Sequence, residues 1–434
     1  MRRPERRHGS QRTRPTSAPA GPPRQVRIAA VGAQGDGLVE GGGFVPFTLP
    51  GEVATAAFAG ERGEVTHLLS PSPERVEPPC PHFFACGGCA LQHWEHGAYL
   101  AWKAEQVRLA LGRAGLECEM LPPYAAPPAS RRRFALHARR GPSRDEARLG
   151  YKARRSWDLV EIAVCPISDP RLVAAIPALR RLAAPFLEHP KSAPILHVTL
   201  TATGLDVDVT GVERKTGGLS ADARLRAAEA AAAADFARVT MSGEVVYGAR
   251  APVVRLGGAS VALPPGAFLQ AVPGAEAAMA RDIVEAVAGA RQVADLFCGV
   301  GTFTFPIAEV ASVHGADGAP EAVAALKAAV GTAPGLKAVT AEVRDLDRRP
   351  VLAAELKKFD AAVFDPPRAG AEAQSAELAR AESLRTVVGV SCNPATFARD
   401  ARILVDGGFT LARVRPVDQF LWSPHLELVG VFTR

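Results

Sequence analysis

The stretch VADLFCGVGTFTFPIAEV, residues 293–310, decides the fold of the C-terminal half of the chain. An apolar run contains Asp295 near its end, Gly299 and Gly301 follow in a turn, and a helical pattern comes next. Helical stretches then separate three further apolar runs, at residues 312–317, 359–365 and 386–391. Because strands and helices alternate, we expect a parallel, doubly wound sheet.

The glycine turn is typical of a nucleotide site. Asp317 closes the next strand, 18 residues after Gly299, where a carboxylate can accept hydrogen bonds from both ribose hydroxyls. A dinucleotide site would need a third glycine at Thr304, because the pyrophosphate requires close helix packing. The pattern therefore argues against NAD and suits S-adenosylmethionine, which has no phosphate. An ordinary strand-to-helix turn is the alternative.

Two more side chains are expected at the carboxyl edge of this sheet, where ligands bind in open α/β folds. Asp365 ends one strand, before two prolines, and Cys392 ends the next, before Asn393 and a helix. A thiolate near a helix N-terminus has a lowered pKa and is nucleophilic. We therefore expect reaction chemistry at Cys392; an inert buried cysteine and a turn-capping Asp365 are the alternatives.

The N-terminal part of the chain reads differently. Residues 1–27 hold eight arginines and one glutamate, whereas the whole chain has a net charge of +6. We expect residues 1–25 to be a disordered basic tail that favours polyanions, with a transit peptide or a solubilising tail as alternatives. Short alternating runs with glycine and proline turns then predict a small β-barrel at residues 26–77, which either binds nucleic acid or is a structural accessory.

Four of the seven cysteines can converge on one site. Cys80, Cys86 and Cys89 follow a C-x5-C-x2-C pattern, and Cys165 precedes a proline. Three-plus-one spacing predicts a metal site. Structural zinc usually takes two Cys-x2-Cys pairs, and a cysteine followed by proline is typical of iron–sulfur sites, so zinc is the weaker alternative.

A basic stretch lies between these cysteines. It runs from Arg131 to Arg155 and is interleaved with Tyr151 and followed by Trp157. Positive charge with aromatic rings suits folded RNA, because phosphates bind the arginines and unstacked bases bind the rings. A merely solvated face is the alternative. Alternating strands from residue 193 to 262, around an alanine-rich helix, predict an antiparallel sheet with helices.

Four motifs then identify a family. In chain order they are DLFCGVGTF, DPPRAG, SCNPATFARD and HLELV. Together they resemble the RNA uracil-5-methyltransferases, specifically the bacterial 23S ribosomal RNA branch with an N-terminal TRAM barrel and a 4Fe–4S cluster. The resemblance covers residues 26–434. It implies an α/β fold with a Rossmann-like methyltransferase domain at residues 281–434, a TRAM/OB-like barrel, and a central α+β RNA-binding domain with the cluster at residues 78–280.

The same resemblance implies roles for single residues. Cys392 would be the nucleophile and Glu427 the base, with His425 as the alternative base. Thr302 stands where related enzymes have asparagine, and Asp317 where they have glutamate. The implied S-adenosylmethionine contacts are Gln270, Phe297, Thr302, Asp317, Asp345 and Asp365. The implied RNA contacts are Phe268, Arg131 and Arg133, and the implied 4Fe–4S ligands are Cys80, Cys86, Cys89 and Cys165.

The sequence thus predicts an enzyme that makes 5-methyluridine in 23S rRNA. A transfer RNA T-loop methyltransferase and a non-catalytic RNA-binding ribosome assembly factor are the alternatives. Every apolar stretch is broken before the ~20 residues needed to cross a bilayer, so no membrane span is expected. Few cysteines and no visible signal peptide favour a cytoplasmic location, and we expect a monomer.

Overall fold

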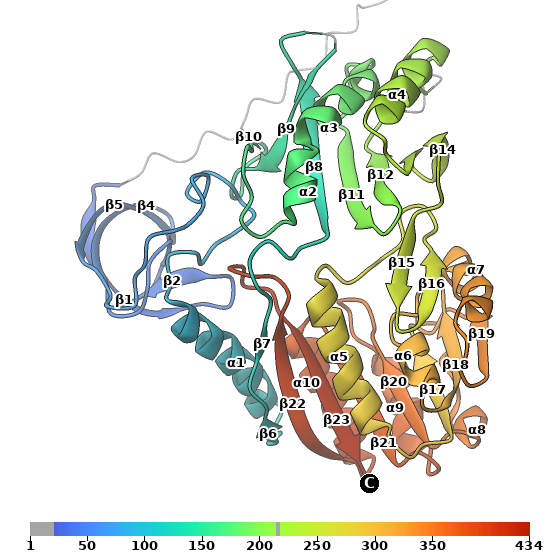
Figure 1. Ribbon diagram of the computed structural model, residues 1–434. Coiled ribbons are helices and arrows are strands. Elements are labelled where there is room, and N and C mark those ends of the chain that lie inside the picture. Colours follow the sequence, from blue (N-terminus) through green and yellow to red (C-terminus); the bar gives the residue numbers. More distant parts are fainter. Residues whose placement is uncertain (1–20, 144, 214–217) are drawn as a thin grey trace, which may run out of the picture. The chain divides into compact units, whose positions relative to one another are not determined.

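The computed structural model describes residues 21–143, 145–213 and 218–434 (Figure 1). It divides into two compact units, Met1–Val76 and Glu77–Arg434. Most of the predicted basic tail, residues 1–20, lies outside the described residues. Strand β1 already begins at Arg24, inside the stretch that we assigned to the tail. Among the described residues, no helix is both long and apolar enough to cross a membrane.

The first unit contains a small closed β-barrel with strand order β1-β2-β3-β5-β4. Alternate residues point inward and bury Val26, Ile28, Val45 and Ala54. Because the barrel is closed, each of its five strands pairs with a neighbour on both sides. An open sheet would instead expose unpaired backbone groups at its edges to other chains. The strands are β1 (Arg24–Val31), β2 (Asp36–Val39), β3 (Phe44–Pro46), β4 (Val53–Ala59) and β5 (Arg62–Ser70).

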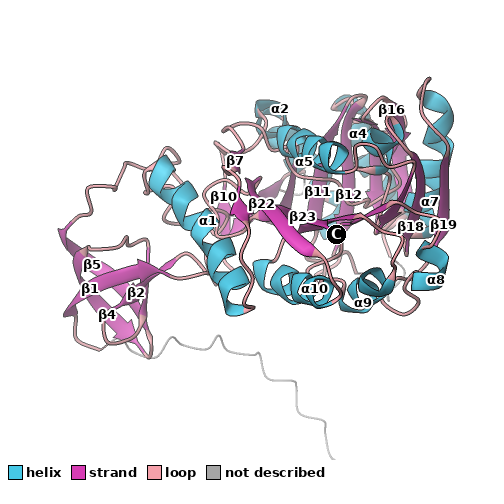
Figure 2. Ribbon diagram, turned by 90° about the horizontal axis from the view of Figure 1, so that it is seen from below, coloured by secondary structure: helices cyan, strands magenta, loops and turns pink. Residues whose placement is uncertain are grey.

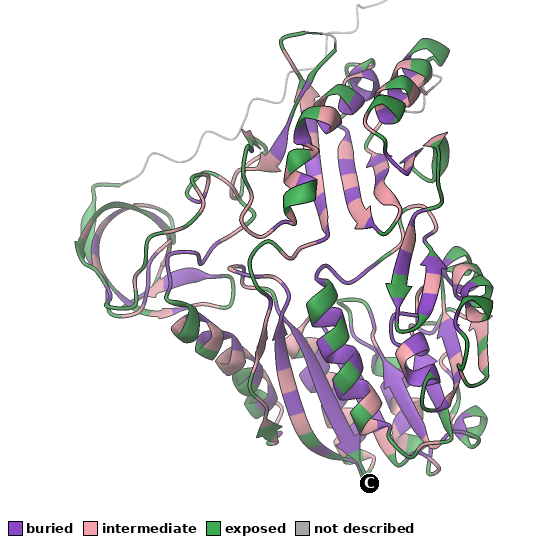
Figure 3. Cartoon of the chain, viewed as in Figure 1, coloured by how far each residue is buried: buried purple, intermediate pink, exposed green. Residues whose placement is uncertain are grey.

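The second unit is built around a nine-stranded sheet with the order β19-β18-β17-β20-β21-β23-β22-β6, in which β7 also pairs with β22. Strands β17 to β21 are parallel, and β23 is antiparallel to both of its neighbours. Strands β20 and β21 are buried along nearly their whole length (Figure 3). The strands are β17 (Gln292–Leu296), β18 (Ser312–Asp317), β19 (Val339–Val343), β20 (Ala361–Phe364), β21 (Thr386–Ser391), β22 (Thr410–Asp418), β23 (Glu427–Thr433), β6 (Glu119–Met120) and β7 (Tyr124–Ala125).

Helices cover both faces of this sheet (Figure 2). Helices α5 and α6 pack on one face, with α7 beside β18 and β19. Helices α1, α8, α9 and α10 form the core on the other face. Their bounds are α5 (Pro273–Ala286), α6 (Thr304–Ala308), α7 (Pro320–Ala329), η2 (Val330–Thr332), α8 (Ala353–Leu356), α9 (Glu372–Arg380), α10 (Pro394–Asp406) and α1 (His96–Arg113).

Helix α1 and the strands β6 and β7 join this sheet layer, although the sequence placed them in the central region. The physical reason is the apolar face of α1. Val107 and Leu111 are buried against Phe397 and Leu404 of α10. The short strands then pair in parallel with β22 and extend the sheet.

A second, seven-stranded sheet has the order β10-β9-β8-β11-β12-β13-β14. All its pairs are antiparallel except β12 with β13. A hairpin of β15 and β16 leads from it to α5. The strands are β8 (Arg133–Arg140), β9 (Ala147–Lys152), β10 (Leu159–Glu161), β11 (Ile195–Thr201), β12 (Gly204–Thr210), β13 (Arg238–Met241), β14 (Glu244–Gly248), β15 (Val253–Leu256) and β16 (Ala259–Ala262). The helices of this part are α2 (Pro170–Ala174), α3 (Ile176–Ala183), η1 (Pro185–Leu187) and α4 (Ala221–Ala233).

Candidate active site

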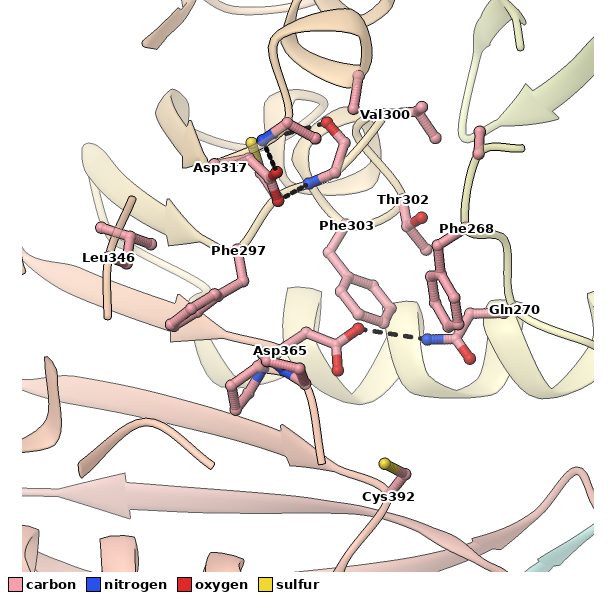
Figure 4. A pocket seen from close by; sticks show the side chains of 18 of the residues that line it. Phe268, Gln270, Phe297, Val300, Thr302, Phe303, Asp317, Leu346, Asp365 and Cys392 are labelled. Atoms are coloured by element: carbon pink, nitrogen blue, oxygen red, sulfur yellow. Dashed lines mark hydrogen bonds between the residues drawn. The ribbon is translucent and has the colours of Figure 1, made fainter. Parts of the chain in front are cut away.

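A cavity of about 830 Å³ opens at the carboxyl ends of the parallel strands. The chain order runs outward from β17 in both directions, toward β18 on one side and β20 on the other, so the switch point lies beside β17. Open α/β sheets bind ligands at such a point. The cavity brings together the residues that the sequence had singled out at this sheet edge, among them Gly299, Asp345, His425 and Glu427. Figure 4 shows seven others, namely Phe268, Gln270, Phe297, Thr302, Asp317, Asp365 and Cys392.

The glycine turn after β17 has the expected backbone. Gly299 and Gly301 have φ angles of +54° and +98°, which favour glycine. A Cβ atom on Gly301 would lie 2.5 Å from the Phe305 ring, whereas one on Gly299 would meet open space. Asp317 accepts hydrogen bonds from the backbone N–H groups of Gly299 (2.9 Å) and Ala319 (2.7 Å). The carboxylate therefore shapes the turn, and each oxygen keeps a lone pair for a ligand.

The side of the cavity beside this turn carries two apolar side chains, Phe297 and Leu346. Phe297 adopts a φ of +62°, a strained conformation for a bulky residue, and packs with Leu346. Figure 4 shows both side chains on the same side of the cavity. Asp345, next to Leu346, is exposed and pairs with Arg348 at 3.6 Å. Thr302 is buried in the wall nearer to Phe268.

A chain of hydrogen bonds crosses the floor of the cavity. The Gln270 amide donates to Asp365 Oδ2 at 3.2 Å. The Gln419 amide donates to Gln270 Oε1 at 2.6 Å and to Glu427 Oε1 at 3.2 Å. Gln419 Oε1 in turn accepts from the N–H of Ala271 at 2.9 Å. Two carboxyl groups are thus held in fixed positions by two amides.

Burial raises the pKa of both carboxyl groups. The pKa of Asp365 rises to about 7 because the group is fully buried, although the Gln270 hydrogen bond opposes the rise. The pKa of Glu427 rises to about 8, first because of burial and then because of the charge on Asp365. Glu427 can therefore exchange a proton close to neutral pH, which is what a general base or acid requires.

The pKa of Cys392 contradicts our prediction. We expected the N-terminus of α10 to lower it, but the pKa is raised. Burial is the largest cause, and the negative charge of Glu427 is the next; the Arg368 guanidinium partly opposes both. In addition, the side chain of Asn393 caps α10 and accepts from the N–H of Ala395 at 3.1 Å, so this N–H group at the helix end already has an acceptor.

The sequence did not indicate a functional role for three residues at this site. Arg368 lies three residues after Asp365 in a quoted motif, Gln419 joins Glu427 to Gln270, and Phe420 lines the cavity. Arg368 Nη2 lies 3.0 Å from His425 Nδ1. Because a guanidinium group can only donate, His425 Nδ1 is the acceptor. Burial and the charges of Arg368 and Lys103 lower the pKa of His425. The order of motifs could have indicated Arg368, whereas Gln419 and Phe420 follow no recognisable pattern.

The four clustered cysteines line a separate cavity of about 320 Å³. All four are free thiols. The Cys80 and Cys86 thiols have raised pKa values because of burial and because of the charge on Cys165, and the pKa of Cys89 rises to about 12, mainly through burial. Across residues 21–143, 145–213 and 218–434, no group of three or more His, Cys, Asp or Glu side chains is arranged to hold a single metal ion.

We call the cavity that contains Cys392 and Glu427 the reactive cavity, and the one lined by the four clustered cysteines the cysteine cavity. The two predicted RNA-binding arginines, Arg131 and Arg133, lie beside the reactive cavity and not in it. They line a neighbouring cavity of about 250 Å³ that shares Phe268 and Phe420. The Arg133 guanidinium lies 5.7 Å from the centre of the Phe268 ring, and that of Arg131 lies 5.8 Å from Phe420. Phe268 is 69% exposed, so its ring faces the cavity mouth.

Known proteins resemble this chain closely. Residues 264–434 match the model of the tRNA (Uracil-5-)-methyltransferase family. An uncharacterized RNA methyltransferase of Caulobacter vibrioides is 66% identical, over 95% of this chain and all of the relative. The 23S rRNA (uracil(1939)-C(5))-methyltransferase RlmD of Vibrio vulnificus is 31% identical, over 90% of this chain and 91% of the relative.

A solved structure agrees with these relatives. The tRNA (uracil-54, C5)-methyltransferase of Pyrococcus abyssi, in complex with S-adenosyl-L-homocysteine, has a TM-score of 0.72 and 25% identity, covering 94% of this chain and 99% of its own. The chain belongs to the RNA uracil-5-methyltransferase family. The predicted fold class, with a Rossmann-like domain and an N-terminal closed barrel, is confirmed.

Proposed function

We propose that this protein is an S-adenosylmethionine-dependent methyltransferase that forms 5-methyluridine in 23S rRNA. One observation carries the proposal: a single cavity joins a glycine-turn cofactor site to Cys392 and Glu427. A non-catalytic RNA-binding factor would have no need of a thiol, an acid and a cofactor turn in one cavity.

The residues of the cavity suit S-adenosylmethionine. The open space above Gly299 admits close approach of a ligand, and Asp317 offers acceptors for the ribose hydroxyls. The apolar pair of Phe297 and Leu346 suits a purine ring, with Asp345 next to Leu346, and Thr302 lines the wall nearer to Phe268 (Figure 4). When bound, this cofactor supplies an electrophilic methyl group.

The reaction follows from the weakness of uracil carbon 5 as a nucleophile. We propose that the Cys392 thiolate adds to carbon 6, which moves an electron pair toward carbon 5 as an enolate. Carbon 5 then attacks the methyl group, and the methyl–sulfonium bond breaks to leave S-adenosylhomocysteine. The base is stacked in duplex RNA, so the nucleotide must be unpaired or flipped out, with Phe268 at the mouth to stack on it.

Release of the enzyme needs loss of the carbon 5 proton. We assign this step to Glu427, whose raised pKa of about 8 suits proton exchange near neutral pH. As the proton leaves, the carbon 5–carbon 6 double bond forms again and the Cys392 sulfur departs as a thiolate. Gln419 holds the Glu427 carboxyl in place, and Gln270 holds Asp365.

The cysteine cavity suits a 4Fe–4S cluster better than zinc. Zinc needs its sulfurs about 2.3 Å from one point, whereas Cys80, Cys86, Cys89 and Cys165 surround a cavity of about 320 Å³. Hydrogen bonds to Cys86 Sγ from Gly88 N (3.4 Å) and to Cys165 Sγ from Ser168 (3.3 Å) suit thiolate ligands. The cluster would tie together the segments of the central domain, and methyl transfer itself needs no electrons.

The choice of 23S rRNA rests on the cysteine set and the barrel, together with the likeness to the Vibrio vulnificus enzyme. Transfer RNA is the second candidate, because the Pyrococcus abyssi protein that covers nearly the whole chain is described as a tRNA methyltransferase. Arg131 and Arg133 would hold phosphates of either RNA next to the flipped base.

The test is transfer of labelled methyl from S-adenosylmethionine to unmodified 23S rRNA and, in parallel, to unmodified tRNA, followed by digestion to nucleosides. We expect label in 5-methyluridine from rRNA with the wild type and none with Cys392→Ala. Label in tRNA alone would reassign the substrate. No label in either RNA from intact, cluster-loaded protein would refute the enzyme and favour the RNA-binding factor.

A further inference from the structure

One short segment separates the reactive cavity from the cysteine cavity. This wall segment, residues 418–426, joins β22 to β23, and its residues Phe420 and His425 line both cavities. It contains Gln419 and ends next to Glu427, the two residues linked on the cavity floor. The position of the wall segment therefore decides where the Glu427 carboxyl lies.

Helix α1 holds one side of the wall segment. Lys103 Nζ makes an ion pair with Asp418 Oδ1 at 2.5 Å, and both side chains are almost fully buried. The same Nζ donates to the backbone oxygens of His425 (2.6 Å) and Phe420 (3.3 Å). The Tyr99 hydroxyl donates to Asp418 Oδ2 at 2.7 Å. A single ammonium group thus pins three points of the wall segment.

The cysteine-bearing segment holds the other side. The backbone N–H groups of Ala90 and Leu91 both donate to the Trp422 oxygen, at 2.8 and 3.0 Å. Trp422 has a φ of +58°, a conformation that a bulky residue keeps only when its surroundings impose it. The side chain of Gln92, which follows Leu91 in the chain, accepts from the N–H of Cys80 at 3.2 Å. The wall segment is therefore tied to the backbone around the cysteines.

A buried ion pair is an expensive way to stabilise a fold, because apolar residues of similar volume often do as well. The value of the Lys103–Asp418 pair lies in fixing one geometry. We propose that Lys103 is a positioning residue, which through Asp418 and the wall segment keeps Gln419 and Glu427 aligned for removal of the carbon 5 proton. The inference rests on the proposed function and adds to it a residue remote from the reacting atoms.

The test separates methyl transfer from enzyme release. If Glu427 is displaced, methylated RNA stays bonded to Cys392, so a denaturation-resistant protein–RNA adduct that carries labelled methyl accumulates. For Lys103→Met we expect adduct formation within about twofold of wild type and release slowed about 10- to 100-fold. For Tyr99→Phe, which loses one hydrogen bond, release slows about threefold. Arg108→Gln changes an exposed residue of the same helix and should match the wild type.

A second readout needs no activity. Amide hydrogen exchange across residues 418–427 should become faster in Lys103→Met and stay unchanged in Arg108→Gln, with cofactor affinity unchanged in both. Equal losses of adduct formation, release and cofactor affinity would overturn the positioning role and show general destabilisation. If Lys103→Met does not fold, Tyr99→Phe decides: release at the wild-type rate overturns the proposal. A wild type that forms no 5-methyluridine refutes the proposed function itself. Faster exchange at residues 418–427 in Lys103→Met would then still show that Lys103 holds the wall segment in place.

Discussion

The reactive cavity and the cysteine cavity lie on either side of one wall segment, yet they are built in opposite ways. The reactive residues stand at or just beyond the ends of β17, β18, β20 and β21 or, for Glu427, at the start of β23, where the sheet register fixes them. The four cysteines sit on irregular chain, in residues 80–89 and at Cys165. The sheet fixes the backbone that carries the reactive residues, whereas the loops that carry the cysteines need a ligand to fix theirs.

The largest effect should come from the thiol of the reactive cavity. Cys392→Ala should lower methyl transfer by a factor of about 10⁴ or more, because it removes the nucleophile that we assign to the activation of carbon 5. Cofactor affinity, measured by calorimetry, should change by less than about twofold, since the glycine turn does not depend on this side chain. Cys118→Ser, outside both cavities, is the matched control. If cofactor affinity is lost along with turnover, Cys392 has a structural role.

The next effect concerns the cysteine cavity. Protein purified without oxygen should be brown and contain iron and sulfide near four per chain. Cys165→Ser should lose iron and colour, melt at a lower temperature and bind RNA more weakly, while cofactor affinity stays unchanged. A colourless protein with one zinc ion would overturn the cluster assignment and the contrast between the two cavities.

Glu427→Gln should lower turnover about 10²- to 10⁴-fold and cause the methylated adduct to accumulate. In the wild type the rate of release from the methylated adduct should rise with pH up to about 8, because the carboxyl is protonated below its raised pKa and only the carboxylate accepts a proton. The pH profile and the adduct fraction can be measured on the same samples. A profile that is flat between pH 6 and 9, with no adduct in Glu427→Gln, would move the base role to His425.

The smallest effect is on the reactivity of the thiol itself. The charge of Glu427 raises the pKa of Cys392 and that of Arg368 lowers it. Alkylation of Cys392 at pH 7.5, followed by peptide mass spectrometry, should therefore be faster in Glu427→Gln and slower in Arg368→Gln, by a few-fold each. Alkylation of Cys118 gives the internal reference rate. Rates that shift together in both variants would show a change in access to the cavity and not in pKa.

The contrast between the cavities also explains how far the sequence could be read. Asp317, Asp365 and Cys392 were placed correctly at one sheet edge, because parallel strands end on the same side and their order in the chain is visible. The closed barrel was equally accessible, from its alternating pattern and glycine turns.

Other features depend on long-range packing. The pKa of Cys392 was predicted in the wrong direction, because burial and Glu427, 35 residues further along the chain, outweigh the local helix end. The place of α1 on the catalytic sheet depends on its fit to α10, nearly 300 residues away in sequence. Gln419 was missed because an amide that bridges two other side chains leaves no periodic signal.

The most direct test of the central claim uses RNA that carries 5-fluorouridine at the target position. With fluorine in place of hydrogen, carbon 5 has no proton for the base to remove. The reaction should therefore stop after methyl transfer, with the enzyme still bonded to carbon 6. With S-adenosylmethionine present, we expect a denaturation-resistant adduct whose peptide map places the bond at Cys392, and no adduct with Cys392→Ala. A bond at another residue, or full methylation of ordinary RNA by Cys392→Ala, would contradict the account.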